Sequence, residues 1–338
     1  MRATFNKYLL KYLLYCCLTL GSLGFAAPAS TFQERSDVQQ FIATLVSQYH
    51  FTAPYLTSLF AKIEVDPRVI SSISHPYEKK PWDLYRARFV TEERIKEGAR
   101  YWHEHPEILQ KAHEMYGVPV EIIVAILGAE TFYGRIQGNY SVLNTLATLA
   151  FDYPKRAPFF KKELTEFLLL CREYQFDPSE IKGSYAGAIG QPQFMPSSYR
   201  YYAIDSEAKG RSDLRNNPHD IVLSIANYLK KNGWQTDLPI ADPVKTTGEL
   251  YKTLAIDSKK PLYSVASLRS QGIKPLWYDY PNDLQASLIR LDNTNNAEYW
   301  MVFPNFFSIL RYNTSPQYAM AVFLLSEEIR KQYIRAYT

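Results

Sequence analysis

Glu130 stands at the end of an apolar run in which few other side chains could take part in chemistry. The residues seven, four and three positions before it are Ile123, Ile126 and Leu127, so in a helix its carboxylate shares a face with apolar side chains. Burial disfavours the charged form of a carboxyl and raises its pKa, as a general acid working near neutral pH requires. An ion pair with nearby Arg135 is the alternative, and this position alone favours that structural interpretation.

The segment 183–199 carries glycines at its start and polar and aromatic side chains after them. Glycine lets a ligand or another part of the backbone approach closely. An extended polar ligand could receive hydrogen bonds and apolar contacts from the side chains that follow, which are Ser184, Gln193, Phe194, Met195 and Tyr199. A tight turn followed by the start of a helix explains the same pattern, and spacing alone does not separate the two.

Rigid elements must position these residues, and the chain reads as mainly helical. Pro119 begins a run whose apolar side chains cover nearly every face as far as residue 131, which predicts a helix buried in the middle of the molecule. Further helices are expected at 141–150, 159–174, 219–232 and 316–333, and short strands at 286–291 and 299–303. The predicted fold class is α+β, predominantly α, with a small antiparallel sheet.

The N-terminal residues are typical of a secretory signal peptide. Basic residues flank an apolar run over 12–25 that is shorter than the roughly 20 residues of a membrane-spanning helix, and small residues follow it. We expect residues 1–26 to be removed after export to the periplasm. An outer-membrane lipid anchor on Cys16 or Cys17 is less favoured, because a large residue precedes each cysteine.

Composition excludes some classes of partner. The chain has 38 Lys and Arg against 34 Asp and Glu without a dense basic cluster, so no nucleic-acid partner is expected. After removal of the signal peptide Cys171 is the single cysteine, in an apolar stretch, and we expect a buried thiol without a disulfide partner. The 27 Tyr and 18 Phe suit carbohydrate binding, but equally an ordinary core.

Several motifs together resemble one known family. The segments 130–135, 153–157, 183–199, 226–229 and 311–313 look like those of the B-type lytic murein transglycosylases. The resemblance runs from about residue 80 to residue 321 with the motifs in the same order. It implies a goose-lysozyme-like catalytic core flanked by a helical domain and a small β domain. The implied divisions are a signal peptide at 1–26, a helical domain at 32–118, the core at 119–240, a β subdomain at 241–312 and a C-terminal helix at 313–338 that packs on the core.

The resemblance also implies a reaction. Such enzymes cleave the β-1,4 bond between N-acetylmuramic acid and N-acetylglucosamine of peptidoglycan without adding water, and leave a 1,6-anhydromuramic end. By position, Glu130 would protonate the leaving oxygen and then accept the proton of the muramyl 6-hydroxyl. No cofactor and no second carboxyl are needed, unlike the paired carboxylates of most glycosidases. Asp152 is expected to be a turn residue and Glu163 to lie on a solvated helix face.

The family's substrate contacts carry over by position. The implied cleft residues are Tyr85, Ser184, Gln193, Phe194, Met195, Tyr228, Tyr312, Asn313 and Tyr318, and Lys155 and Arg156 would face peptide or carboxylate groups of the wall. The expected partner is the peptidoglycan glycan strand, and proteins of wall synthesis or division stay open as further partners. A hydrolytic muramidase on the same core and a non-catalytic wall-binding protein remain as alternative functions.

Residues 205–216 occupy the place of an EF-hand-like loop of the family. Asp205, Glu207 and Asp213 could supply oxygen ligands, and Gly210 stands at the turning position. Lys209 puts an ammonium where calcium needs an oxygen, and Asn216 replaces the terminal carboxylate. The sequence therefore predicts a degenerate loop without a tight metal site.

Overall fold

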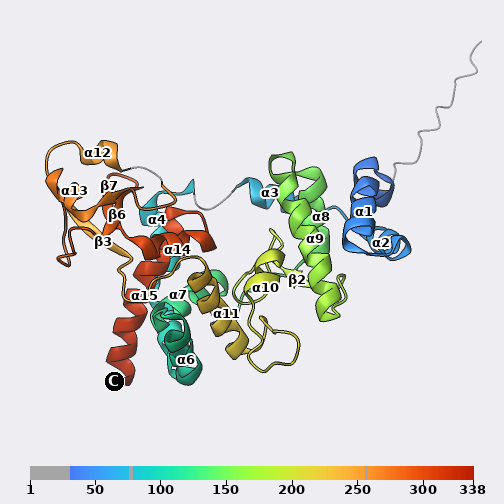
Figure 1. Cartoon of the computed structure of the whole chain (residues 1–338), viewed down its shortest axis with the longest axis horizontal. Helices are drawn as coiled ribbons and strands as arrows, with labels where there is room; N and C mark the ends of the chain where they lie inside the picture. Colours follow the sequence, from blue (N-terminus) through green and yellow to red (C-terminus); the bar gives the residue numbers. More distant parts are fainter. Residues whose placement is uncertain (1–30, 76–78, 256–257) are drawn as a thin grey trace, which may run out of the picture. The chain divides into compact units, whose positions relative to one another are not determined.

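The computed structural model describes residues 31–75, 79–255 and 258–338, and it divides into two compact units at Lys62 (Figure 1). The predicted signal peptide lies outside the described residues. In the first unit η1 (Phe32–Glu34) precedes α1 (Ser36–Tyr49) and α2 (Ala53–Phe60). Helix α1 buries Val38, Ile42 and Leu45, which repeat on one helical face, and it ends at His50 in the left-handed conformation.

The second unit is mainly helical, as predicted. Most of its helices begin with proline in the first turn, where a missing N–H costs nothing. They are α3 (Pro67–Ser74), α4 (Trp82–Phe89), α5 (Glu92–Glu104), α6 (Pro106–Tyr116), α7 (Val120–Thr131), α8 (Val142–Asp152), η3 (Pro154–Arg156), α9 (Ala157–Tyr174), α10 (Pro196–Tyr202), α11 (Pro218–Lys231), α12 (Tyr251–Leu254), α13 (Val265–Ser270), α14 (Pro304–Tyr312) and α15 (Pro316–Tyr337).

Helix α7 is the centre of this unit. It packs against α5, α6, α11 and α15, and Figure 1 shows it next to α6, α11 and α15. Most of its side chains are therefore buried whichever way they point. A helix that is apolar all round requires neighbours all round, and the structure supplies them. The predicted buried helix is therefore confirmed, and its last turn carries Glu130.

A five-stranded antiparallel sheet has the strand order β4-β6-β7-β3-β5. Its strands are β3 (Ala241–Thr246), β4 (Tyr263–Ser264), β5 (Ile273–Pro275), β6 (Gln285–Asp292) and β7 (Ala297–Val302). The β6–β7 hairpin pairs Leu288 with Met301, and both side chains enter a small apolar core with Ile273 and residues of α13. The predicted strands correspond to β6 and β7. Strands β3 and β5 contain prolines, which weaken the strand pattern of a sequence.

A buried carboxylate fixes the loop that follows β5. Asp242 is fully buried (0% exposed) in β3 and accepts hydrogen bonds from the N–H groups of Leu276 (2.9 Å), Trp277 (3.0 Å) and Tyr278 (3.2 Å). The hydroxyl of Tyr280 donates a further bond of 3.0 Å to it. Three consecutive backbone donors converge on one carboxylate, so the loop has a fixed shape although Leu276, Trp277 and Tyr278 expose their side chains.

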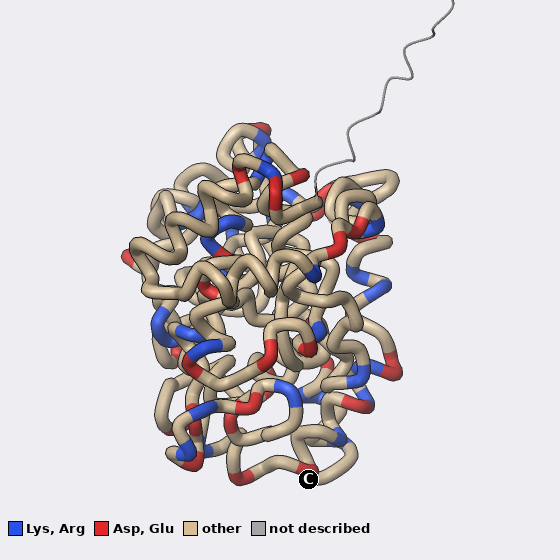
Figure 2. Tube along the Cα trace, turned by 90° about the vertical axis from the view of Figure 1, so that its right-hand side faces the viewer, with Lys and Arg blue, Asp and Glu red and all other residues tan. Residues whose placement is uncertain are grey.

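Lys and Arg are interspersed with Asp and Glu over the described chain (Figure 2). Among the described residues no single helix is long and apolar enough to cross a membrane, and only α6 with α7, bent by 113° at their junction, reach that length together.

A second, two-stranded sheet pairs β1 (Tyr140–Ser141) with β2 (Lys182–Gly183) and so holds the start of the 183–199 segment close to the chain that follows α7.

Candidate active site

Glu130 lies half-buried in the last turn of α7, where the chain leaves the helix through an unusual turn. Phe132, Tyr133 and Gly134 have φ angles of 51°, 58° and 87° in succession. Non-glycine residues with such angles are uncommon and need support from their surroundings. The Tyr133 hydroxyl supplies it by donating to the carbonyl of Arg94 in α5 at 2.7 Å. The turn ends the helix at Thr131, one residue after Glu130.

Thr131 joins this helix end to the 183–199 segment. Its Oγ1 donates to the carbonyl of Gln191 at 3.0 Å and accepts from the N–H of Gly134 at 3.0 Å. The side chain is buried, so both bonds are shielded from water. The two motifs that the sequence singled out are therefore fixed to each other by one threonine.

Arg135, which the sequence offered to Glu130 as an ion-pair partner, pairs with two glutamates of α5. Its Nη1 lies 3.3 Å from Glu93 Oε1, and its Nη2 lies 2.5 Å from Glu97 Oε2. Glu130 has a different partner, the hydroxyl of Tyr318, which donates to its Oε1 at 2.5 Å. The arrangement favours the functional interpretation of Glu130.

The Glu130 carboxylate influences the pKa of two neighbouring phenols, those of Tyr312 and Tyr318. Burial, followed by the neighbouring Glu130 carboxylate, raises the pKa of both phenols well above the ordinary value of 10.0. Both phenols therefore keep their protons throughout the physiological range. Tyr85 of α4 also contributes to the shift in the pKa of Tyr318, and α4 packs against α15, the helix that carries Tyr318.

Aromatic side chains form a cluster next to this carboxyl. Tyr228 lies 4.8 Å from Tyr312 and 5.4 Å from Phe194 between ring centroids, and Tyr312 lies 5.8 Å from Phe194. The hydroxyl of Tyr312 donates to the carbonyl of Pro192 at 2.7 Å. The structure therefore brings together Glu130, Tyr85, Phe194, Tyr228, Tyr312 and Tyr318 from the predicted set.

The 183–199 segment consists of two tight turns followed by the start of α10. Ser184 Oγ accepts hydrogen bonds from the N–H groups of Ala186 (3.2 Å) and Ala188 (3.0 Å), and Gln193, with a φ of 53°, donates from Nε2 to the carbonyls of Gln137 (3.2 Å) and Gly190 (2.8 Å). A Cβ at Gly183 would lie 2.1 Å from the carbonyl oxygen of Ala188, so the glycine allows the backbone to approach. The residue spacing in the sequence did not reveal that the Ser184 and Gln193 side chains also stabilise these turns through bonds to the backbone.

The remaining predicted residues lie at the borders of these elements. Met195 is half-buried at the start of α10, and Asn313 follows α14 and accepts from the N–H of Ser315 at 3.1 Å. Lys155 and Arg156 are exposed in η3, with the Arg156 guanidinium 4.3 Å from the Phe159 ring centroid. No contact of these two basic side chains with the cluster around Glu130 occurs in the described part of the chain.

Two expectations for individual side chains were wrong. Tyr199 is buried and donates from Oη to the carbonyl of Ser212 at 2.9 Å, so it holds a loop and does not face a ligand. Glu163 is 2% exposed and not on a solvated face; its two oxygens accept from Ser197 Oγ (2.7 Å) and from the N–H of Ser197 (2.9 Å). Burial raises the pKa of Glu163. Phe160 and Phe167, at helical spacing on either side, were the signal for burial.

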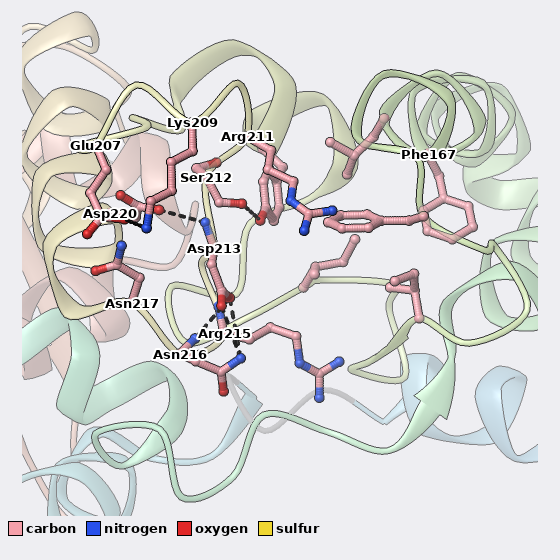
Figure 3. Close-up of a pocket in the computed structure, with 15 residues that line it drawn as sticks. Phe167, Glu207, Lys209, Arg211, Ser212, Asp213, Arg215, Asn216, Asn217 and Asp220 are labelled. Carbon is pink, nitrogen blue, oxygen red and sulfur yellow. Dashed lines mark hydrogen bonds and ion pairs between the residues drawn. The ribbon is translucent and has the colours of Figure 1, made fainter.

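The EF-hand-like loop, 205–216, borders a pocket of about 560 Å³. Asp205 accepts from the N–H of Gly210 at 2.6 Å, and Asp213 accepts from the N–H groups of Arg215 (2.9 Å) and Asn216 (3.0 Å). The Lys209 ammonium pairs with Glu207 and points toward Asp220 (Figure 3). Across residues 31–75, 79–255 and 258–338 no group of three or more His, Cys, Asp or Glu side chains could hold a metal ion. A lysine thus lies among the carboxylates of this loop.

Known proteins are similar to this chain in sequence and in fold. The family model described as "Transglycosylase SLT domain" matches residues 33–327. The membrane-bound lytic murein transglycosylase B of Escherichia coli (strain K12) is 37% identical over 308 residues, covering 88% of this chain and 84% of its own length. The E. coli lytic transglycosylase Slt35, solved in complex with calcium, is 37% identical with a TM-score of 0.81 and covers 90% of this chain and 96% of its own. SltB3 of Pseudomonas aeruginosa, solved with NAG-NAM-pentapeptide, is 29% identical with a TM-score of 0.77 and covers 89% of this chain and 80% of its own.

Proposed function

The chain belongs to the transglycosylase SLT domain family of lytic murein transglycosylases, and on this premise we propose that Glu130 is the single acid and base that cleaves peptidoglycan. Enzymes of this family cleave the glycan strand, and the resemblance found in the sequence is confirmed. The observation that supports the assignment is the hydrogen bond from Tyr318 to Glu130, in the last turn of a mostly apolar helix.

The reaction needs Glu130 in two protonation states. As an acid it gives its proton to the glycosidic oxygen, and the C–O bond to the muramyl carbon breaks. As a carboxylate it then takes the proton of the muramyl 6-hydroxyl, whose oxygen closes the 1,6-anhydro ring. The apolar surroundings favour the acid form, and the donated hydrogen bond from Tyr318 favours the carboxylate. The two influences oppose each other, so neither form is excluded.

Ser184 can donate a hydrogen bond to the substrate, and Gln193 can accept one from it. The oxygen of Ser184 already accepts two N–H bonds, so its own proton can be donated to a carbonyl such as that of an acetamido group. The Nε2 of Gln193 is occupied by two backbone carbonyls, so its Oε1 is the atom that can accept from a sugar hydroxyl or N–H. We assign Tyr85, Phe194, Met195, Tyr228, Tyr312, Asn313 and Tyr318 to the cleft wall, and Lys155 and Arg156 to peptide carboxylates.

An envelope location follows from the membrane-bound relative. The finer assignment to the periplasm rests on the secretory pattern of residues 1–26, which lie outside the described residues. SltB3 was solved with a disaccharide pentapeptide, and this supports a peptidoglycan strand as the partner here.

Digestion of purified sacculi followed by mass spectrometry tests the proposal. Wild type should release products with 1,6-anhydro ends, one water lighter than hydrolysis products. Glu130→Gln should release almost none while keeping the thermal unfolding of wild type, and Glu163→Gln, which changes a buried carboxylate bonded to Ser197, serves as the control. Reducing ends from wild type would make the enzyme a hydrolytic muramidase, and an active Glu130→Gln variant would remove Glu130 from the mechanism.

A further inference from the structure

Helix α4 is a short element that brings Tyr85 to the candidate active site. It has 8 residues, and no side chain caps its N-terminus. Isolated helices shorter than about 12 residues are marginal in water, so a helix of this length depends on its neighbours. Tyr85 is nevertheless only 1% exposed, and its phenol influences the pKa of Tyr318. Contacts from other elements of the second unit therefore hold α4 in place.

Glu298 of β7 accepts hydrogen bonds from two tryptophan side chains. Its Oε2 receives the indole N–H of Trp82 at 3.3 Å and that of Trp300 at 3.2 Å. Its Oε1 receives an N–H of the Asn293 side chain at 3.1 Å. Trp82 is the first residue of α4 and is fully buried, so no water could replace the carboxylate as the partner of its indole N–H. Within the described part of the chain no basic side chain pairs with Glu298, so its carboxylate serves N–H groups of neutral side chains.

Two further contacts hold the start of α4. Asp83 accepts from the N–H (3.0 Å) and from the hydroxyl (2.8 Å) of Thr294, which lies in the turn between β6 and β7. On the side of α15, Gln317 donates from Nε2 to the carbonyl of Lys80 at 3.0 Å. Gln317 directly precedes Tyr318 in the chain. The start of α4 is therefore bonded both to the β6–β7 hairpin and to the first turn of α15.

The position of Tyr85 follows that of Trp82. Three positions separate the two residues on one helical face, and their ring centroids are 6.3 Å apart. Tyr85 and Tyr318 are both buried, so water has little access to the Tyr318 hydroxyl from the side of α4. A shift of Trp82 would carry Tyr85 away from Tyr318 and admit water between them.

We propose that Glu298 is a positioning residue for the cleavage reaction, because its bond to Trp82 fixes the helix that carries Tyr85. Tyr85 in turn keeps water from the Tyr318 hydroxyl, whose hydrogen bond to Glu130 is stronger in dry surroundings. The inference rests on the proposed function and adds to it a residue that acts through α4. The β6–β7 hairpin thereby contributes to catalysis as the support of this helix.

Kinetics on soluble peptidoglycan strands test this role. Glu298→Ala should lower kcat roughly tenfold and change KM less than about twofold, because it disturbs the geometry of the reacting groups and removes no substrate contact. Glu298→Gln keeps an oxygen for the indole N–H groups and should restore most of the loss. Trp82→Phe, which removes the donor and keeps a ring, should reproduce it. The matched control is Asp292→Asn, which changes an exposed carboxylate of β6 that pairs with Arg290, and it should behave as wild type.

A double-mutant cycle separates this role from a general loss of stability. In the Tyr318→Phe background, Glu298→Ala should lower kcat less than about twofold, since the hydrogen bond that it supports is already absent. Equal losses of kcat in the two backgrounds would overturn the inference. Trp82→Phe goes through the same cycle, so the test stays decisive if Glu298→Ala does not fold.

Hydrogen exchange separates failure of this inference from failure of the proposed function. The backbone amides of α4 should exchange faster in Glu298→Ala than in wild type, and those of α7 should exchange at the same rate. Unchanged exchange of α4 would overturn the inference, and so would faster exchange with the kcat of wild type. Absence of anhydro products from wild type would instead overturn the proposed reaction and leave the exchange result standing.

Discussion

The Tyr318 hydroxyl and the Glu130 carboxylate meet at 2.5 Å although 188 positions separate them in the chain. Tyr318 lies in the first turn of α15, where its N–H bonds to the Ser315 side chain at 3.3 Å. Glu130 lies in the last turn of α7. The C-terminal helix therefore completes the candidate active site, in addition to packing on α5 and α7.

Tyr318→Phe removes the donor and keeps the ring. A hydrogen bond to a charged group contributes about 1.5–3 kcal/mol, so we expect kcat to fall by roughly ten- to a hundredfold. Without the donor the carboxylate form of Glu130 is less favoured, and the high-pH limb of the rate profile should move to higher pH. Tyr312→Phe, which loses a bond to a backbone carbonyl, is the matched control and should leave that limb in place. Identical profiles for wild type and Tyr318→Phe would contradict this role.

Glu163→Gln should change how stability depends on pH. Burial holds the pKa of Glu163 above its ordinary value of 4.5, so the folded state keeps this proton to a higher pH than the unfolded chain. The unfolded state then binds fewer protons, and stability contributed by Glu163 is lost as pH rises from about 4.5 through the folded pKa. Melting curves at several pH values should show that the stability of the variant rises relative to that of wild type between pH about 4.5 and neutrality. A constant difference would mean that the carboxyl does not titrate there.

Calcium should leave wild-type stability unchanged, because the Lys209 ammonium lies among the loop carboxylates. Thermal unfolding in millimolar calcium and in chelator should coincide. The double variant Lys209→Asp with Asn216→Glu restores oxygen ligands at two positions and should gain stability with calcium, about 2.7 kcal/mol at a hundredfold excess over Kd. A calcium-dependent shift in wild type would show that Lys209 moves aside for the ion.

Asp242→Ala should destabilise the sheet region. The substitution leaves three backbone N–H groups and the Tyr280 hydroxyl without their acceptor, and we expect a loss of about 3 kcal/mol in the free energy of unfolding. Urea denaturation measures it. Asp279→Ala removes an exposed carboxylate that pairs with Arg269 in the same region and should cost less than about 0.5 kcal/mol. Equal effects would show that the loop does not depend on Asp242.

Local patterns predicted α7 and the β6–β7 hairpin, because apolar residues at helical or alternating spacing dominate both. They could not predict that Tyr318 meets Glu130, since only tertiary packing brings α15 to the end of α7. The family resemblance supplied that residue. The prediction for Glu163 was wrong because glutamate side chains usually lie on the surface. Its helical neighbours Phe160 and Phe167 indicated a buried face. The left-handed turn at Phe132 and Tyr133 has no sequence signal, since neither residue type favours positive φ.

The position of Glu130 depends on a helix with core residues on every side. A loop can move without disturbing the rest of a protein, but α7 cannot shift unless α5, α6, α11 and α15 separate from it. The carboxyl should therefore keep its geometry until the whole second unit unfolds. Heating should abolish activity and tertiary structure at the same temperature, and the enzyme should show no partly folded, inactive state below that point.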